Sequence, residues 1–278
     1  MRDDLQAAAA TLARAGVETP CADAEWLLAG LLGVGRAALA LELDAGLPAD
    51  MARRYDTAVR RRAEREPLQR ILGWEGFRGL RLRVTPDVLV PRPETEMLVE
   101  WALALTPTPR LVVDVGTGSG CIACAIAVER PTGRVLAVDS SAAAAAVAGA
   151  NVEALRLGPR VSVVVADLLA PLGTAAADLI VANLPYIPTA TLPTLSPEVA
   201  RHEPRAALDG GVDGLALIRR LIATAHARLA AGGALVLETA GGTQTPAVVE
   251  LMRTAGFTGV ATHPDLLGVE RFVAGRCG

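Results

Sequence analysis

A four-residue motif, Asn183-Leu-Pro-Tyr186, has the residue types needed to hold a nitrogen atom for chemistry. The Asn183 side-chain carbonyl and the main-chain carbonyl of Leu184 can each accept one hydrogen from a substrate NH2 group. Pro185 restricts residue 184 to an extended backbone, and the Tyr186 ring can stack on a planar amide or base. Such a clamp directs the nitrogen lone pair at an electrophilic carbon, so catalysis comes from orientation and electrostatics.

This motif predicts two overlapping sets of site residues. We expect Asn183, Pro185 and Tyr186 to be catalytic, and all four residues from Asn183 to Tyr186 to bind substrate. The alternative is an ordinary loop, because Asn and Pro are common turn residues. The position of the motif directly after a predicted strand favours the functional interpretation, since open α/β sheets bind ligands at the carboxyl ends of their strands.

A glycine-rich loop, Asp114-Val-Gly-Thr-Gly-Ser-Gly120, runs from a second predicted strand into a helix that begins near Cys121. Its glycines let the backbone turn sharply and approach a ligand closely. Asp139 stands at the tip of the next strand, where a carboxylate can accept both hydroxyls of a ribose. The predicted cofactor-binding residues are Asp114, Gly116, Thr117, Gly118, Ser119, Gly120, Asp139, Asp167, Leu168 and Asn183.

Two nucleotide-like cofactors compete for this loop. Counted from Gly118, the residues to Ala123 match the G-x-G-x-x-A dinucleotide fingerprint, so the glycines alone do not decide. An acid within the strand, Asp114, followed by G-x-G-x-G instead resembles the methyltransferase signature for S-adenosylmethionine. We therefore expect S-adenosylmethionine, with a nicotinamide or flavin and a purely structural turn as the alternatives.

The elements around these motifs predict an α/β fold. Continuous apolar runs bounded by turn residues recur along the chain, with helical stretches between most of them, which indicates a parallel sheet covered on both faces. The tail at 257–276 predicts two further strands that end antiparallel. We expect a class I, Rossmann-like, seven-stranded and mostly parallel sheet, with strands at 111–115, 134–139, 161–167, 177–183 and 234–238.

Three domains are expected along the chain. Residues 1–66 predict a small helical domain for substrate recognition, with helices at 5–15, 22–32 and 49–65. Short alternating stretches with several glycines predict a β-hairpin connector at 67–90. Residues 91–278 are expected to form the cofactor-binding domain.

Bulk composition limits the classes of function. A net charge of −3 argues against a surface shaped entirely for nucleic acid. All 27 basic residues are arginine, which excludes a Schiff-base lysine and a P-loop lysine. Four scattered cysteines and an acidic start without a long apolar run predict a cytoplasmic protein that does not cross a membrane. Cys121 and Cys124 have the spacing of half a metal site but no second pair, so no metal is expected.

Together the motifs resemble the PrmC/HemK family of protein-glutamine N-methyltransferases, over nearly the whole chain. The combination is specific, although each motif alone is not. The segments that carry the resemblance are Val90-Pro-Arg-Pro-Glu-Thr-Glu96, the loop 114–120, Asn183-Leu-Pro-Tyr-Ile-Pro188 and Glu203-Pro-Arg-Ala-Ala-Leu-Asp-Gly-Gly-Val-Asp-Gly214.

The resemblance implies methylation of the glutamine in the Gly-Gly-Gln loop of class 1 peptide-chain release factors. It places the cofactor on residues 116–120 and Asp139, and the substrate on residues 183–186. In the family the stretch at 91–96 borders the active site, so we expect Arg92 to help close the pocket on the substrate.

Alternative functions remain open at this point. Leu184 stands where the family usually has Pro, and Asn-Leu-Pro-Tyr is typical of ribosomal RNA adenine dimethylases. A nucleic-acid exocyclic amine is therefore the second candidate substrate, although the acidic net charge and only 3% aromatic residues count against nucleic acid. An inactive scaffold that binds cofactor is the third. The arginines at 53–65 predict a basic helix side, either simply solvated or a docking face for a release factor or nearby RNA.

Overall fold

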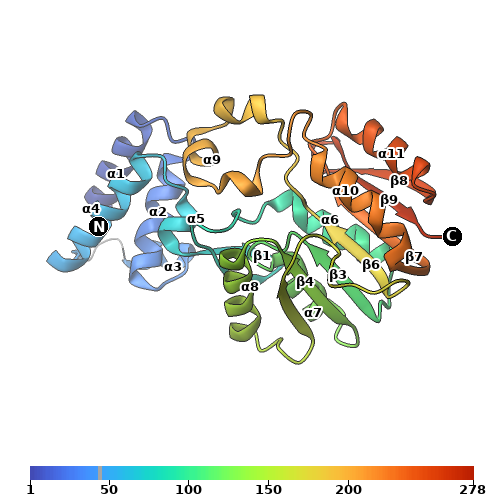
Figure 1. Ribbon diagram of the computed structural model, residues 1–278. Helices are drawn as coiled ribbons and strands as arrows, with labels where there is room; N and C mark the ends of the chain where they lie inside the picture. The colour runs from blue at the N-terminus through green and yellow to red at the C-terminus, as the bar shows by residue number, and fades with distance from the viewer. Residues whose placement is uncertain (43–45) are drawn as a thin grey trace. The chain divides into compact units, whose positions relative to one another are not determined.

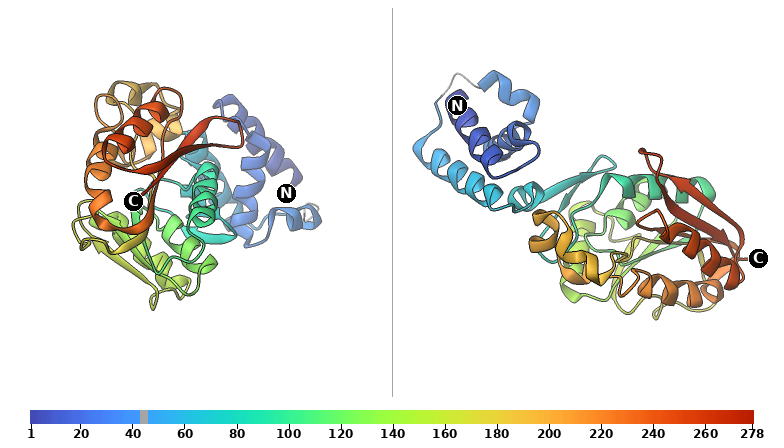
Figure 2. Two further views of the ribbon diagram at one scale, coloured as in Figure 1. Left: turned by 90° about the vertical axis from the view of Figure 1, so that its right-hand side faces the viewer. Right: turned by 90° about the horizontal axis from the view of Figure 1, so that it is seen from above.

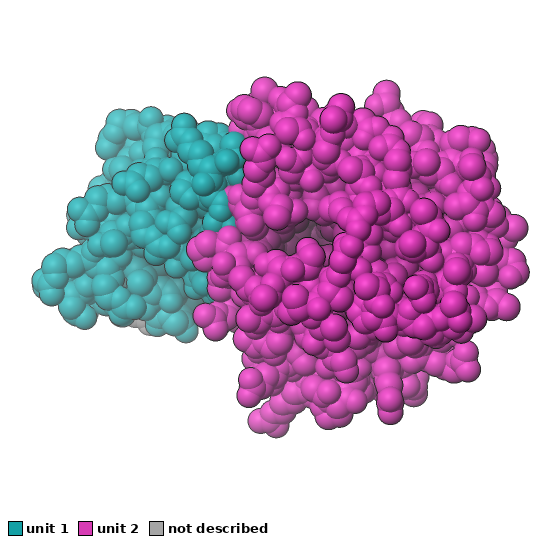
Figure 3. All heavy atoms as spheres, in the orientation of Figure 1, with its two compact units in different colours: residues 1–74, 196–202 teal, residues 75–195, 203–278 magenta. Residues whose placement is uncertain are grey.

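The computed structural model describes residues 1–42 and 46–278 and divides them into two compact units. Unit 1 contains Met1–Trp74 and Ser196–His202, and unit 2 contains Glu75–Leu195 and Glu203–Gly278 (Figure 3). A short segment from the second half of the sequence therefore belongs to the unit formed by the first quarter of the chain.

Unit 1 is helical (Figure 1). The three predicted helices are confirmed with ends shifted by up to three residues, whereas α3 and α5 were missed because seven and five residues are too few to show a periodic pattern. The helices are α1 (Arg2–Arg14), α2 (Pro20–Leu32), α3 (Arg36–Glu42), α4 (Ala49–Ala63), α5 (Leu68–Leu72) and α9 (Pro197–His202).

Apolar residues of α1, α2 and α4 form the core of unit 1, and buried charges are paired beside it. The Tyr55 hydroxyl donates a hydrogen bond of 3.0 Å to the carbonyl of Ala24. Arg62 donates to the buried Asp23 at 2.6 Å and to Glu198 of α9 at 2.9 Å. Arg65 also binds Glu198, so two guanidinium groups attach α9 to the end of α4.

Unit 2 contains a seven-stranded sheet with the order β5-β4-β3-β6-β7-β9-β8. All neighbours up to β7 pair in parallel, and β9 is antiparallel to both β7 and β8, so the predicted mostly parallel sheet with an antiparallel tail is confirmed (Figures 1 and 2). The strands are β3 (Leu111–Val115), β4 (Arg134–Asp139), β5 (Val161–Val165), β6 (Ala177–Ala182), β7 (Leu229–Glu238), β8 (Thr258–Pro264) and β9 (Glu270–Arg276).

Three strand ends differ from the predictions, and the smallest difference is at β6, which ends at Ala182, one residue early. Strand β5 stops at Val165, two residues early, because its register with β4 ends at Asp139. Strand β7 begins at Leu229, five residues early. The pair Gly232-Gly233 looks like a turn in the sequence, but the chain passes through it as a register shift within the sheet.

Both faces of the sheet are covered, because successive strand residues point to opposite sides. Val112 and Leu179 pack into one apolar cluster with helices α6 (Pro93–Leu105) and α7 (Cys121–Glu129). Val113 and Ile180 pack into the other cluster with α10 (Ala216–Ala225) and α11 (Gln244–Thr254). Helix α8 (Ala142–Ala154) packs beside β4 and β5.

The remaining elements are short. The predicted hairpin is formed by β1 (Trp74–Phe77) and β2 (Leu80–Arg83). Within residues 1–42 and 46–278, 3-10 helices occur at Thr189–Thr194, Arg205–Ala207 and His226–Arg228. Among the described helices, none has the length and apolar character required to cross a bilayer.

Candidate active site

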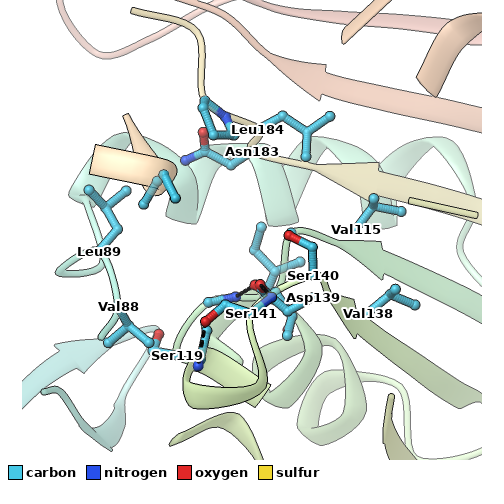
Figure 4. Close-up of a pocket in the computed structure, with 18 of the residues that line it drawn as sticks. Val88, Leu89, Val115, Ser119, Val138, Asp139, Ser140, Ser141, Asn183 and Leu184 are labelled. Atoms are coloured by element: carbon cyan, nitrogen blue, oxygen red, sulfur yellow. Dashed lines mark hydrogen bonds between the residues drawn. The ribbon is translucent and has the colours of Figure 1, made fainter. Parts of the chain in front are cut away.

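A cavity in unit 2 opens where β3, β4, β5 and β6 end, at their carboxyl edge. The empty space between its lining atoms, including the solvent in its open mouth, is about 1070 Å³. Figure 4 shows Asn183 and Leu184 on one side and Asp139, Ser140 and Ser141 on the other. The predicted site residues that line it are Arg92, Gly116, Thr117, Gly118, Ser119, Asp139, Asp167, Leu168, Asn183, Leu184 and Pro185.

Three predicted site residues do not line this cavity, namely Asp114, Gly120 and Tyr186. Asp114 lies behind the glycine-rich loop and is fully buried. It accepts a hydrogen bond of 2.6 Å from the Thr117 hydroxyl and one of 3.1 Å from the amide of Ala123. Burial raises the pKa of this carboxyl to about 7, although both hydrogen bonds lower it. Asp114 therefore holds the loop onto the start of α7.

The glycines of the loop are needed for two different reasons. Gly116 has φ +74°, and a Cβ there would lie 2.9 Å from the side chain of Leu184. Gly120 has φ +80°, and its Cβ would lie 3.2 Å from Ala148 of α8. Gly116 thus leaves space for the neighbouring Leu184 side chain, whereas Gly120 allows the loop to pack closely on a helix.

Backbone amides fix the Asp139 carboxylate at the cavity. One oxygen accepts a hydrogen bond of 2.9 Å from the amide of Gly118, and the other accepts one of 2.8 Å from Ser141 (Figure 4). A carboxylate has about four acceptor positions, so lone pairs remain for two further donors. The amides of Gly116 and Thr117 also bind the carbonyl of Val138, which joins the loop to the end of β4.

Asp167 and Leu168 follow the end of β5 and line the same cavity. The Asp167 carboxylate is exposed and accepts a hydrogen bond from Arg220 of α10. Leu168 adopts φ +46°, a region that non-glycine residues rarely occupy. Such strain is typical of turns that present a side chain or amide to a ligand.

The motif begins directly after β6, which ends at Ala182. The Asn183 side-chain nitrogen donates a hydrogen bond of 3.0 Å to the Thr95 hydroxyl oxygen. No donor within residues 1–42 or 46–278 binds the Asn183 side-chain oxygen, and that oxygen is not enclosed by protein. Asn183 therefore lines the cavity, and its side-chain oxygen accepts no hydrogen bond from the described residues.

A buried carboxylate, Glu238 at the end of β7, lies behind the motif and is 1% exposed. It accepts a hydrogen bond of 2.8 Å from the Thr95 hydroxyl and one of 3.2 Å from the Tyr186 hydroxyl. Burial raises the pKa of Glu238 to about 7, although both hydroxyls lower it. Burial also raises the pKa of Tyr186, with Glu238 adding to the effect. Tyr186 is thus anchored through its hydroxyl, outside the cavity lining.

Arg92 lines the cavity and pairs with Glu203, at 2.8 Å and 2.9 Å between its Nη2 and the two carboxylate oxygens. The Glu203 side chain is 1% exposed. Loss of Arg92 would remove an ion pair from a buried carboxylate, which destabilises proteins. The pair connects the two family-like segments at 90–96 and 203–214.

Several residues of the site were not assigned a role from the sequence. Thr95 and Glu203 lie inside the segments 90–96 and 203–214, and the resemblance of these segments to the family was the only sequence feature that pointed to them. Asn151 of α8 lies in no recognisable motif. Its side chain nevertheless donates to the carbonyl of Ser119 at 2.8 Å, and it forms hydrogen bonds with both the amide and the carbonyl of Arg83. Residues added to the cavity lining by the fold include Val88, Leu89, Ser140, Ser141, Ala206, Ala207 and Leu217.

Comparisons with known proteins agree with this architecture. The family model described as the PrmC N-terminal domain matches residues 4–73, and the one described as the methyltransferase small domain matches residues 93–194. Release factor glutamine methyltransferase of Geobacter sulfurreducens is 45% identical over 96% of this chain and 93% of its own length. The protein of the same name from Mycolicibacterium smegmatis is 43% identical over 98% of this chain and 96% of its own.

Solved structures agree in fold. The hMettl16 catalytic domain in complex with MAT2A 3′UTR hairpin 1 superimposes with a TM-score of 0.60, at 18% identity over 83% of this chain and 80% of that one. A methyltransferase from Pyrococcus furiosus gives 0.53, at 17% identity over 72% of this chain and 90% of that one. These likenesses concern the fold alone and confirm the predicted class I architecture. The full-length relatives confirm the resemblance of the motifs, and the chain belongs to the release factor glutamine methyltransferase family.

Proposed function

We propose that this chain transfers a methyl group from S-adenosylmethionine to the side-chain amide nitrogen of the glutamine in the Gly-Gly-Gln loop of class 1 peptide-chain release factors. One observation carries the proposal: Asn183, with its side-chain oxygen available, lines the same cavity as Asp139 and the glycine-rich loop. An acceptor for a nitrogen and a cradle for a nucleotide-like cofactor thus open into one space. The full-length relatives named for this activity support the same assignment.

The residues of the cavity fit the cofactor. Asp139 would accept the ribose hydroxyls, because backbone amides already hold it in place and leave lone pairs available. Gly116, Thr117, Gly118 and Ser119 would bind the amino-acid portion along the loop. The Oδ1 atom of Asp114 is buried without a hydrogen-bond partner among the described residues, so a cationic group beside the loop would compensate its charge. Asp167 and Leu168 would border the adenine.

The reaction needs orientation more than acid–base strength. When bound, the cofactor supplies a methyl carbon attached to a positively charged sulfur. Asn183 Oδ1 and the Leu184 carbonyl would accept the two amide hydrogens of glutamine and direct its nitrogen toward that carbon. Transfer would replace the carbon–sulfur bond of the cofactor, whose electron pair stays on sulfur, with a nitrogen–carbon bond, and one nitrogen proton would pass to solvent. Pro185 restricts the backbone at residue 184. The Tyr186 hydroxyl donates to Glu238 and so holds the end of the motif.

A transfer assay tests this function. The protein is incubated with S-adenosylmethionine labelled in its methyl group and, separately, with a purified class 1 release factor, the Gln→Ala variant of its Gly-Gly-Gln loop, and ribosomal RNA. We expect label on the unaltered factor alone. Label on RNA would support an exocyclic amine as the substrate, and equal label on the Gln→Ala variant would exclude that glutamine as the acceptor.

We further propose that the helical domain at residues 1–66 recognises the release factor. Arg53, Arg54 and Arg60 are exposed on α4 and give it a basic side. Replacing these three by serine should raise the KM for the release factor several-fold and leave the cofactor Kd unchanged, because long-range charges act on association with the protein partner. An unchanged KM at low ionic strength would mean that this side is simply solvated.

A further inference from the structure

We propose that Thr95 and Glu238 are positioning residues that fix which way the Asn183 amide faces, so that its oxygen meets the substrate nitrogen. This inference rests on the proposed function. The two ends of an asparagine amide have nearly the same shape, so packing alone does not select between them. If the NH2 end of Asn183 faced the substrate, it would meet the NH2 group of the substrate amide. Both groups are donors, so no hydrogen bond would hold the substrate nitrogen.

Hydrogen bonds select one orientation. An ionised carboxylate only accepts hydrogen bonds, so Glu238 requires both of its neighbours to donate. The Thr95 hydroxyl has a single proton and gives it to Glu238 at 2.8 Å. The Thr95 oxygen is then left with lone pairs alone, so Asn183 must offer its NH2 end, at 3.0 Å. The amide oxygen consequently stays available at the cavity.

The members of this chain of hydrogen bonds are well fixed. Thr95 is 2% exposed and Glu238 is 1% exposed, so water does not compete for their hydrogen bonds. The amide of Thr95 donates to the carbonyl of Arg92 in the first turn of α6, and the backbone of Glu238 is paired with Phe272 of β9. Each group comes from an element packed in the core of unit 2, whereas Asn183 sits in the loop after β6. The rigid elements thus impose an orientation on the loop residue.

Protonation of Glu238 would remove this selection. A protonated carboxyl can donate to the Thr95 oxygen, Thr95 can then donate to the Asn183 oxygen, and the NH2 end turns to the cavity. The charged and titratable groups that act on Glu238 are Arg271 of β9, Glu94 of α6 and Tyr186 of the motif. Burial of Glu238 raises its pKa to about 7. Turnover should therefore rise as pH increases through about 7.

The test compares substitutions at one position of α6 with a matched change at its other end. Thr95→Val removes the hydroxyl and keeps the shape, and Thr95→Ser keeps the hydroxyl. Thr106→Val is the control, because Thr106 follows the same helix about 16 Å away and its hydroxyl has no partner among the described residues. For each protein, kcat and KM for release factor, cofactor Kd, unfolding temperature and the pH profile of kcat are measured.

We expect Thr95→Val to lower kcat by about 10- to 100-fold with cofactor Kd within about twofold of wild type, since one orienting hydrogen bond is lost. Thr95→Ser should keep most of the activity and the rise near neutral pH, and Thr106→Val should match wild type. Thr95→Val should lose the pH-dependent rise. Wild-type turnover in Thr95→Val, or an equal loss in Thr95→Ser, would overturn the inference.

A second measurement does not depend on turnover. In wild type with S-adenosylhomocysteine bound, the Asn183 side-chain NH2 protons should exchange slowly with water in nitrogen-15 spectra, and in Thr95→Val they should exchange at the rate of an exposed amide. Equal exchange in both proteins would refute the orienting role even if no transfer to glutamine occurred. Absence of glutamine methylation by wild type would instead refute the proposed function, so the two failures are distinguishable.

Discussion

The two sides of the cavity are held in place by different parts of the polypeptide. On the loop side, Asp139 is fixed by the amides of Gly118 and Ser141, and the loop is attached to β4 through the carbonyl of Val138. On the motif side, Asn183 is fixed by a side-chain hydroxyl that is itself directed by the buried Glu238. Backbone geometry thus forms the loop side, and side-chain hydrogen bonds orient the motif side.

This difference predicts that cofactor binding and turnover are separable. Changes on the loop side should act on the affinity for cofactor, because they alter what the nucleotide and amino-acid portions contact. Changes on the motif side should act on kcat, because they alter the orientation of the reacting nitrogen. A variant that affected both equally would show that the two sides form one unit.

The largest effect is expected for Asn183→Ala. Loss of the amide oxygen would remove one of the two proposed acceptors for the substrate nitrogen, so kcat should fall by about 10²- to 10³-fold, as when one oxyanion-hole donor is removed. The cofactor Kd, measured by calorimetry, should stay within about threefold. Turnover that survived the substitution would contradict the clamp, whereas a parallel loss of cofactor binding would contradict the separation of the two sides.

A smaller effect is expected for Asp139→Ala. Hydrogen bonds to a charged group contribute about 1.5 to 3 kcal/mol, so the cofactor Kd should rise by roughly 10- to 100-fold. At saturating cofactor, kcat should remain within a few-fold of wild type. The unfolding temperature without cofactor serves as the control for loss of the loop structure. Unchanged affinity in a folded variant would show that the ribose does not bind at Asp139.

The smallest effect concerns pH and stability. The pKa of Glu238 is raised from 4.5 to about 7, so between these pH values the folded protein keeps a proton that the unfolded chain has lost. The contribution of Glu238 to the free energy of unfolding is therefore fully present below pH about 4.5, and it is lost as the pH rises to about 7. The difference in unfolding free energy between wild type and Glu238→Gln should decline over this window. Urea titrations at a series of pH values measure it, and a constant difference would mean that Glu238 does not titrate there.

The local patterns predicted much of the fold. Strands β3 and β4 were predicted to the residue, because each is a continuous apolar run with turn residues on both sides. The start of β7 was missed, because Gly232-Gly233 resembles a turn when its neighbours are unknown. Most predicted site residues line one cavity, but Asp114, Gly120 and Tyr186 do not, since sequence position does not show which side of a loop faces a cavity.

Two residues show where sequence interpretation ends. Thr95 lies in the family-like segment 90–96. Its hydrogen-bond partners, Asn183 and Glu238, are 88 and 143 residues away in the chain. Glu198 follows the clamp in sequence, yet it binds Arg62 and Arg65 and belongs to unit 1. Such pairs form only when distant segments are brought together by packing.

By itself, the sequence determined the α/β class, the loop and clamp motifs and the family, because each depends on residue types at short spacing. The tertiary structure alone decided which end of the Asn183 amide is bound by the protein. That choice depends on the hydroxyl protons of Thr95 and Tyr186, which both point to the Glu238 carboxylate. Glu238 is buried at the end of β7, so water does not compete for these two hydrogen bonds.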